Sequence, residues 1–172
     1  QVGRSVRVAG TVRDSVPSVA VSITLNTVDG IAEVVMDNPP VNALTVAGWY
    51  ELADVVTAAG RDPEVGAVVL RAEGKGFNAG VDIKEMQNTE GFDALIGANR
   101  GCYAAFEAVY ECPVPVIAAV NGYAMGLGAT IALFCDVVVA AEDASFADTH
   151  VSVALVAGDG GAVMWPLILP FG

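Results

Sequence analysis

The chain has 172 residues, enough for one well-buried core and too few for two ordinary domains. Hydrophobic residues make up 54% of it and aromatic residues 7%, so the core has to be built from small aliphatic side chains, which favours layered α/β packing. The net charge of −12 argues against a surface for nucleic acid or anionic membranes.

The first residues, the longest uncharged segment and the cysteines bear on the cellular location of the chain. Residues 1–18 have no continuous apolar stretch, which argues against a secretory signal and leaves a disordered or transit-like leader before a folded core of 19–172. Residues 112–135 carry no charge, but prolines and glycines interrupt them, so we expect no membrane span. The three cysteines match neither a zinc site nor a CxxC pair, which favours reduced, buried thiols, no bound metal and a cytoplasmic location.

The folded part is predicted to open with a β-hairpin. Residues 19–26 and 31–36 have strand-like patterns, and Asp29-Gly30 between them is typical of a tight turn. Thr45 is expected to cap a helix that ends at Gly60.

Strands and helices are predicted to alternate along the rest of the chain. The expected elements are a strand at 67–70, a glycine-punctuated loop at 74–82, a helix at 92–109, a strand at 114–120, a turn at 121–125, a helix at 126–134 and a strand at 137–140. This order predicts repeated ββα units.

Three short segments carry most of the functional information. They are NPPVNAL at 38–44, GKGFNAGVDIKEM at 74–86 and NGYAMGLGAT at 121–130. A single turn glycine in any of them would mean little, and neither glycine segment completes a dinucleotide fingerprint or a phosphate-binding P-loop. Together and in this order, they resemble the signatures of the crotonase, or enoyl-CoA hydratase/isomerase, superfamily.

This resemblance implies an α/β crotonase-like spiral that holds an acyl-CoA thioester and stabilises its enolate. The oxyanion hole would be formed by the backbone N–H groups of Val81 and Leu127, with the N-terminus of a helix adding its dipole. Coenzyme A would enter as part of the substrate, with no separate cofactor. Its binding residues by resemblance are Ala79, Gly80, Val81, Asp82, Ile83, Lys84, Gly126 and Gly128.

The two glutamates that hold the attacking water in the hydratases of this family are replaced here. Their positions fall on Thr130 and on His150, the single histidine. We expect His150 and Asp159 to take over acid–base work, with Thr130 orienting a water. Two alternatives stay open: His150 has a structural role, or Asp159 is a nucleophile or only a helix cap. The reaction is also open between lyase, isomerase, hydrolase and decarboxylase chemistry.

The resemblance covers 31–172, whereas members of the family continue into helices that cover the acyl pocket and build a trimer or hexamer. The expectation is therefore a core without those helices, an exposed apolar patch and an undecided assembly. A protein of another class, a catalytically silent CoA-binding or interaction protein or a truncated fragment, is the alternative. Residues 42–120 resemble a mycobacterial CoA-ester ring hydrolase and 122–165 resemble crotonases with an AGDGG loop, so a mosaic or diverged origin is a hypothesis.

Overall fold

The computed structural model describes residues 22–169, so the predicted leader and the first residues of the predicted first strand lie outside the described part. The elements, in chain order, are β1 Ser22–Val28, β2 Ile31–Asp37, α1 Val46–Arg61, β3 Ala67–Ala72, β4 Gly76–Asn78, α2 Ile83–Asn88, α3 Asp93–Tyr110, β5 Val116–Val120, β6 Tyr123–Met125, α4 Leu127–Phe134, β7 Val137–Ala140, β8 Ser145–Ala147, the 3₁₀ helix η1 His150–Val153 and α5 Gly161–Ile168.

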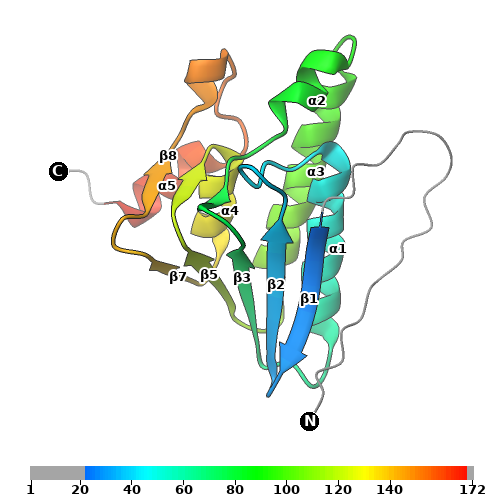
Figure 1. Cartoon of the computed structure of the whole chain (residues 1–172), viewed down its shortest axis with the longest axis vertical. Helices are drawn as coiled ribbons and strands as arrows, with labels where there is room; N and C mark the ends of the chain where they lie inside the picture. Colours follow the sequence, from blue (N-terminus) through cyan, green and yellow to red (C-terminus); the bar gives the residue numbers. More distant parts are fainter. Residues whose placement is uncertain (1–21, 170–172) are drawn as a thin grey trace, which may run out of the picture.

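Two sheets organise the chain into a spiral (Figure 1). The larger sheet has the strand order β1-β2-β3-β5-β7, and the smaller sheet has the order β4-β6-β8. Apart from the antiparallel hairpin β1–β2, all strand pairs are parallel. After the hairpin, which adds both of its strands to the larger sheet, each turn adds one strand to each sheet before its helix, and this confirms the predicted α/β spiral of ββα units.

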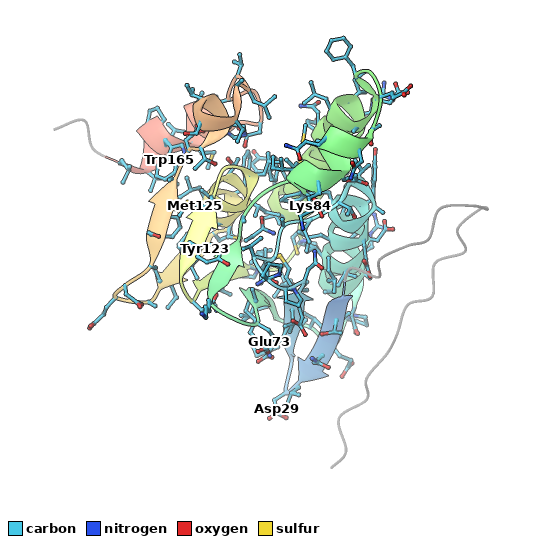
Figure 2. The ribbon with its side chains drawn as sticks, turned by 45° about the horizontal axis from the view of Figure 1, so that its top comes forward. Asp29, Glu73, Lys84, Tyr123, Met125 and Trp165 are labelled. Atoms are coloured by element: carbon cyan, nitrogen blue, oxygen red, sulfur yellow. The ribbon has the colours of Figure 1, made fainter. Side chains whose placement is uncertain are left out.

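The hairpin and the first helix begin as the sequence predicts. Asp29 and Gly30 both have positive φ, 50° and 80°, the conformation of a turn that matches the twist of two antiparallel strands. Asp29 lies at the tip of the hairpin (Figure 2). The hydroxyl of Thr45 accepts a hydrogen bond from the Gly48 N–H at 3.1 Å and so caps α1.

Small aliphatic side chains fill the core, as the composition predicts, around a few large ones. Trp49 on α1 meets Phe106 on α3 edge-on, with ring centroids 6.1 Å apart. Phe106 in turn stacks on Phe134 of α4 at 5.2 Å. This row of rings ties α1, α3 and α4 together.

Three sequence predictions of local structure were wrong in detail. Gly60 lies inside α1 instead of ending it; a side chain there would come within 2.6 Å of the Cys112 sulfur, so close packing explains the glycine. The predicted loop at 74–82 contains β4, and the predicted turn at 121–125 contains β6. Strands of three residues are too short to show alternation, and their partners lie far away in the sequence.

The edge strand β7 exposes several apolar side chains. The β7 residues Val137, Val138 and Val139 are 49%, 37% and 59% exposed on this edge strand. Cys102 and Cys135 are buried, as predicted, whereas Cys112 is half-buried. Across residues 22–169, no helix combines the length and the apolar character that a membrane crossing requires.

Candidate active site

A cavity of about 600 Å³ opens where four segments meet: the loop after β4, the start of α4, the 149–159 segment and α3. Its wall is mainly aliphatic. Of the residues expected in the site, those that line it are Ala79, Gly80, Val81, Ile83, Gly126, Leu127, His150 and Asp159. Gly128 and Thr130 lie behind this lining, and Asp82 and Lys84 do not belong to it.

The first wall is held by two buried asparagines that the sequence reading did not single out. Asn78 is fully buried; its side-chain oxygen accepts the Gly80 N–H at 2.7 Å, and its amide nitrogen donates to the Asn42 carbonyl at 2.7 Å. Asn42, also buried, donates to the carbonyls of Glu73 and Gly76 at 2.8 and 2.9 Å. These bonds fix the loop around Gly80, whose φ of +87° suits glycine.

The Val81 N–H is left free by the way its neighbours are bonded. Leu44 donates to the Gly80 carbonyl at 2.8 Å and accepts the Asp82 N–H at 2.9 Å, forming a one-residue parallel bridge opposite Val81. In such a bridge the Val81 N–H points away from Leu44. In the described part of the chain it has no acceptor. The backbone of Leu44, at the end of the 38–44 segment, thus helps to hold the loop that contains Gly80 and Val81.

The second wall is the start of α4. Gly126, with φ +52°, precedes the helix and donates its N–H to the Ala147 carbonyl at 2.9 Å. The N–H of Leu127, the first helical residue, has no acceptor within the described residues, as is usual for a first helical turn. Gly128 packs directly on the Asn78 backbone, where an added Cβ would collide with the carbonyl.

The two walls lie close together where Gly80 packs against the start of α4. A Cβ added at Gly80 would lie 3.3 Å from the Met125 carbonyl oxygen and 3.5 Å from the Leu127 nitrogen. Val81 and Leu127 both line the cavity. The glycine at position 80 therefore allows two backbone segments that are distant in the sequence to pack closely beside the cavity.

Helix α2 explains the position of two further residues expected in the site. The Asp82 carboxylate accepts the N–H groups of Lys84 and Glu85 at 2.8 and 3.2 Å, so it caps α2. Lys84 lies on α2 (Figure 2) and is exposed. Asp82 thus shapes the edge of the site through the backbone.

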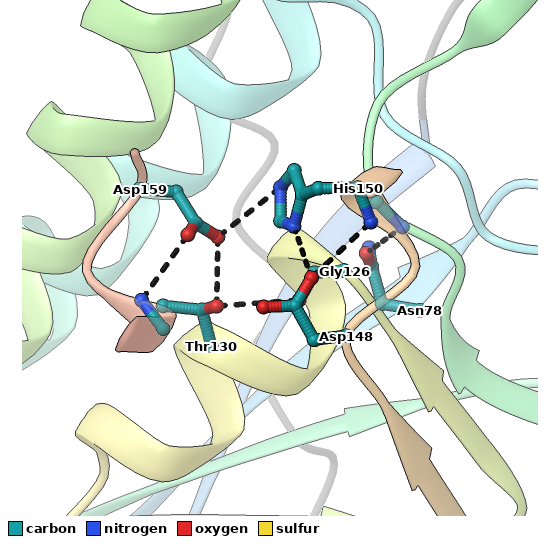
Figure 3. Close-up of polar contacts among 8 residues, drawn as sticks. Asn78, Gly126, Thr130, Asp148, His150 and Asp159 are labelled. Carbon is teal, nitrogen blue, oxygen red and sulfur yellow. Dashed lines mark hydrogen bonds and ion pairs between the residues drawn. The ribbon is translucent and has the colours of Figure 1, made fainter. Parts of the chain in front are cut away.

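Thr130, His150 and Asp159, which the sequence reading selected from separate segments, meet at one point (Figure 3). The Thr130 hydroxyl donates to Asp159 Oδ2 at 2.7 Å. The same Oδ2 lies 3.6 Å from His150 Nε2, and the two side chains are 6% and 11% exposed. A titratable ring and a carboxylate therefore face each other in a shielded position beside the cavity.

The structure also bears on the cap interpretation of Asp159. Its Oδ1 accepts the Gly161 N–H at 3.1 Å, at the start of α5, while Gly160 occupies the cap position itself. Gly160 has φ +103°, and a Cβ there would come within 3.3 Å of the Phe134 ring. One oxygen of Asp159 thus anchors the helix, and the other faces Thr130 and His150.

Asp148 is the acidic neighbour to which the sequence reading gave no role. Its Oδ1 lies 2.6 Å from His150 Nδ1 and accepts the His150 backbone N–H at 3.2 Å. Partial burial alone raises the pKa of Asp148, but the side-chain and backbone hydrogen bonds and the charge of His150 together hold that pKa below its usual value. Asp side chains often accept the backbone N–H two residues further along the chain, so the Asp-Thr-His sequence at 148–150 could have indicated that Asp148 and His150 are in contact.

Comparison with known proteins identifies relatives of the chain. A family model for enoyl-CoA hydratase/isomerase matches residues 26–172. The chain belongs to this family. Two solved members have the same fold: an enoyl-CoA hydratase from Bacillus anthracis, with TM-score 0.81 and 30% identity, and one from Polaromonas, with TM-score 0.80 and 31% identity. Both alignments cover 87% of this chain and 59% of the other.

Curated relatives in the family act on CoA esters. The chain is 65% identical over 117 residues to the (7aS)-7a-methyl-1,5-dioxo-2,3,5,6,7,7a-hexahydro-1H-indene-carboxyl-CoA hydrolase of Mycobacterium tuberculosis, covering 68% of this chain and 47% of that protein. It is 36% identical over 141 residues to the carnitinyl-CoA dehydratase of Citrobacter koseri, covering 81% of this chain and 53% of that protein. The chain thus spans about half the length of these relatives.

Proposed function

We propose that this chain binds an acyl-CoA thioester in the 600 Å³ cavity and stabilises the enolate of the thioester with the N–H groups of Val81 and Leu127. The observation that carries the proposal is the convergence of two acceptor-free amides and the His150–Asp159 pair on one cavity. A donor aimed at a developing oxyanion is worth about 3–4 kcal/mol of transition-state stabilisation. The dipole of α4, which begins at Leu127, adds to the same effect.

His150 and Asp159 supply the acid–base pair. With Nε2 and Oδ2 separated by 3.6 Å, one water molecule can bond to both at ordinary hydrogen-bond lengths of about 2.8 Å. Such a water would be activated by the imidazole and oriented by the carboxylate, which the Thr130 hydroxyl holds in place. This pairing replaces the two glutamates expected from the family pattern.

Water-using chemistry on the CoA ester follows from this arrangement. The names of the two relatives, a hydrolase and a dehydratase, support the same class of reaction. Hydrolysis is the first activity to test, because the hydrolase shares 65% identity over its aligned residues. Hydration and decarboxylation come next.

Coenzyme A carries several negative charges, which the net charge of −12 repels. Cations close to the cavity offset this repulsion locally. Arg100 on α3 lines the cavity, and Lys84 is exposed on α2 beside the Val81 loop. Neither forms an ion pair with another residue of the described part, so both are available to phosphate oxygens.

The experiment is a panel of CoA esters assayed for hydrolysis, hydration and decarboxylation, with calorimetric binding of CoA in parallel. We expect turnover that falls at least about 100-fold in His150→Ala and in Asp159→Asn, with CoA affinity retained. Asp143→Asn is the matched control, because Asp143 is exposed and does not line the cavity.

The result separates the proposal from its alternative. CoA binding without turnover of any ester would favour a catalytically silent CoA-binding protein. Turnover that survives both substitutions would remove His150 and Asp159 from the mechanism. A chain that binds no CoA at all would overturn the proposal.

A further inference from the structure

The imidazole of His150 lies between two carboxylates that come from opposite directions (Figure 3). Asp148, just after β8, contacts Nδ1 at 2.6 Å, and Asp159, just before α5, faces Nε2 at 3.6 Å. The two carboxylates differ in their surroundings. The Asp148 side chain is 32% exposed, whereas that of Asp159 is 6% exposed and bonded to Thr130.

We propose that Asp148 is a positioning residue that holds the proton of neutral His150 on Nδ1, so that Nε2 presents its lone pair to Asp159 and the cavity. The inference rests on the proposed function for its catalytic meaning. The geometry supports it because a carboxylate accepts hydrogen bonds and donates none, so a 2.6 Å contact requires a proton on Nδ1. The second hydrogen bond, from the His150 backbone N–H, prevents the carboxylate from swinging away.

This arrangement suits His150 to act as a base. When Nε2 takes a proton from a bound water or from the substrate carbon, the ring becomes an imidazolium flanked by Asp148 and Asp159. Both carboxylates then stabilise the new positive charge. Without Asp148, the neutral ring could turn or carry its proton on Nε2, where it has no lone pair to offer the substrate.

A purely structural role for Asp148 makes a different prediction. The bond from the His150 backbone N–H to Asp148 Oδ1 alone would hold the turn before η1, whichever ring nitrogen carries the proton. An asparagine at this position keeps a side-chain oxygen for the backbone bond. It can also turn its NH₂ group toward Nδ1 and favour the proton on Nε2. Asp148→Asn therefore separates positioning of the ring from support of the turn.

The first readout needs no activity. His150 is the single histidine, so the ring ¹⁵N resonances of the full chain belong to one residue. At the alkaline end of a pH titration, where these resonances no longer change with pH, we expect the wild-type ring to carry its proton on Nδ1. In Asp148→Asn, a measurable share of that proton should move to Nε2. Asp143→Asn should match wild type. A wild-type ring protonated on Nε2, or an unchanged pattern in Asp148→Asn, would overturn the inference.

The second readout is kinetic. Asp148→Asn should lower kcat by between about 10² and 10⁴-fold and leave KM nearly unchanged, since replacing the carboxylate behind a catalytic imidazole disturbs its tautomer but not substrate binding. Asp148→Glu, which restores a carboxylate, should recover part of the rate. Circular dichroism of each variant confirms folding.

Failure of this inference is distinct from failure of the proposed function. If His150→Ala abolishes turnover and Asp148→Asn does not change it, His150 is catalytic and the positioning role is refuted. If His150→Ala leaves turnover intact, the proposed acid–base role is refuted, and the ¹⁵N pattern still decides whether Asp148 sets the tautomer.

Discussion

The hydroxyl of Thr130 donates a hydrogen bond to Asp159 Oδ2 at 2.7 Å, across a separation of 29 residues in the chain. Thr130 is 1% exposed and lies in α4, so its hydroxyl holds a rigid position behind the cavity. Thr130, at the position where the resemblance places a glutamate, supplies a smaller donor, and the carboxylate that it contacts comes from the loop before α5.

Replacing Thr130 by valine tests this relationship with almost no change of shape. A shielded carboxylate then loses a donor, and we expect the free energy of unfolding to fall by about 2 kcal/mol in urea titrations. Turnover should fall as well, because Asp159 is no longer oriented. Thr57→Val on α1 is the control, since Thr57 is half-buried and helical but has no bond to a carboxylate. Equal stability losses in both variants would contradict the prediction.

The contact between Asp148 and His150 predicts an acid-dependent stability difference. The pKa of Asp148 is lower in the folded chain than the value of about 3.9 expected when unfolded. Its contribution is therefore present above pH about 4 and is lost as the pH falls through the lower folded pKa. The difference in unfolding free energy between wild type and Asp148→Asn should shrink as urea titrations move from pH 5 to pH 2. A difference that stays constant would argue against the pair.

Much of the fold could be predicted because its signals are local. Asp29-Gly30 specifies its turn through two left-handed residues, and Thr45 specifies a helix start through one side-chain bond. The strands of the larger sheet are long enough to show a pattern. The strands of the smaller sheet are three residues each, and β8 was missed because its pairing with β6 alone defines it.

Parts of the candidate site could be recognised in the sequence because they too have local signals. The glycine segments can be recognised from their composition, and His150 can be recognised because it is the single histidine. The network of Asn42 and Asn78 depends on bonds across more than 30 residues, so nothing in the neighbourhood of either asparagine reveals it. The hydrogen bonds of Asn42 and Asn78 can be recognised only after the fold has brought their distant partners together.

The cysteines predict a simple pattern of chemical reactivity. Burial, and then the neighbouring charges of Asp136 and Cys112, raise the pKa of Cys135 to about 12, and burial followed by the charge of Asp159 raises the pKa of Cys102 further. A thiol with pKa 12 is about one ten-thousandth thiolate at pH 8, and thiolate is the reactive form.

With Ellman's reagent at pH 8, we therefore expect the half-buried Cys112 to react first, and all three thiols to react once the chain is unfolded in guanidinium. Cys112→Ser should remove the early phase. Rapid reaction of two or three thiols in the native chain would show that α3 or α4 opens more readily than their packing implies.

The close packing of the two glycine loops gives the sharpest test of the proposed oxyanion hole. Alanine at Gly80 meets two separate penalties: a positive φ of +87°, which costs about 1–2 kcal/mol for a residue with a Cβ, and a Cβ 3.3 Å from the Met125 carbonyl. Gly91→Ala carries the first penalty alone, because its φ is +70° and nothing lies within 4 Å of an added Cβ. The pair separates backbone strain from loop spacing.

We expect Gly91→Ala to lose about 1–2 kcal/mol of unfolding free energy through its positive φ, and Gly80→Ala to lose more, because its Cβ also crowds the Met125 carbonyl. Turnover should fall by about 10² to 10³-fold in Gly80→Ala alone, since the Val81 and Leu127 amides would be pushed out of register with the thioester oxygen. CoA affinity, measured by calorimetry, should change far less than kcat, because the two amides are proposed to act on the charge that develops on the thioester oxygen in the transition state. If Gly80→Ala and Gly91→Ala show the same kcat, the spacing of the two loops is not what stabilises the oxyanion.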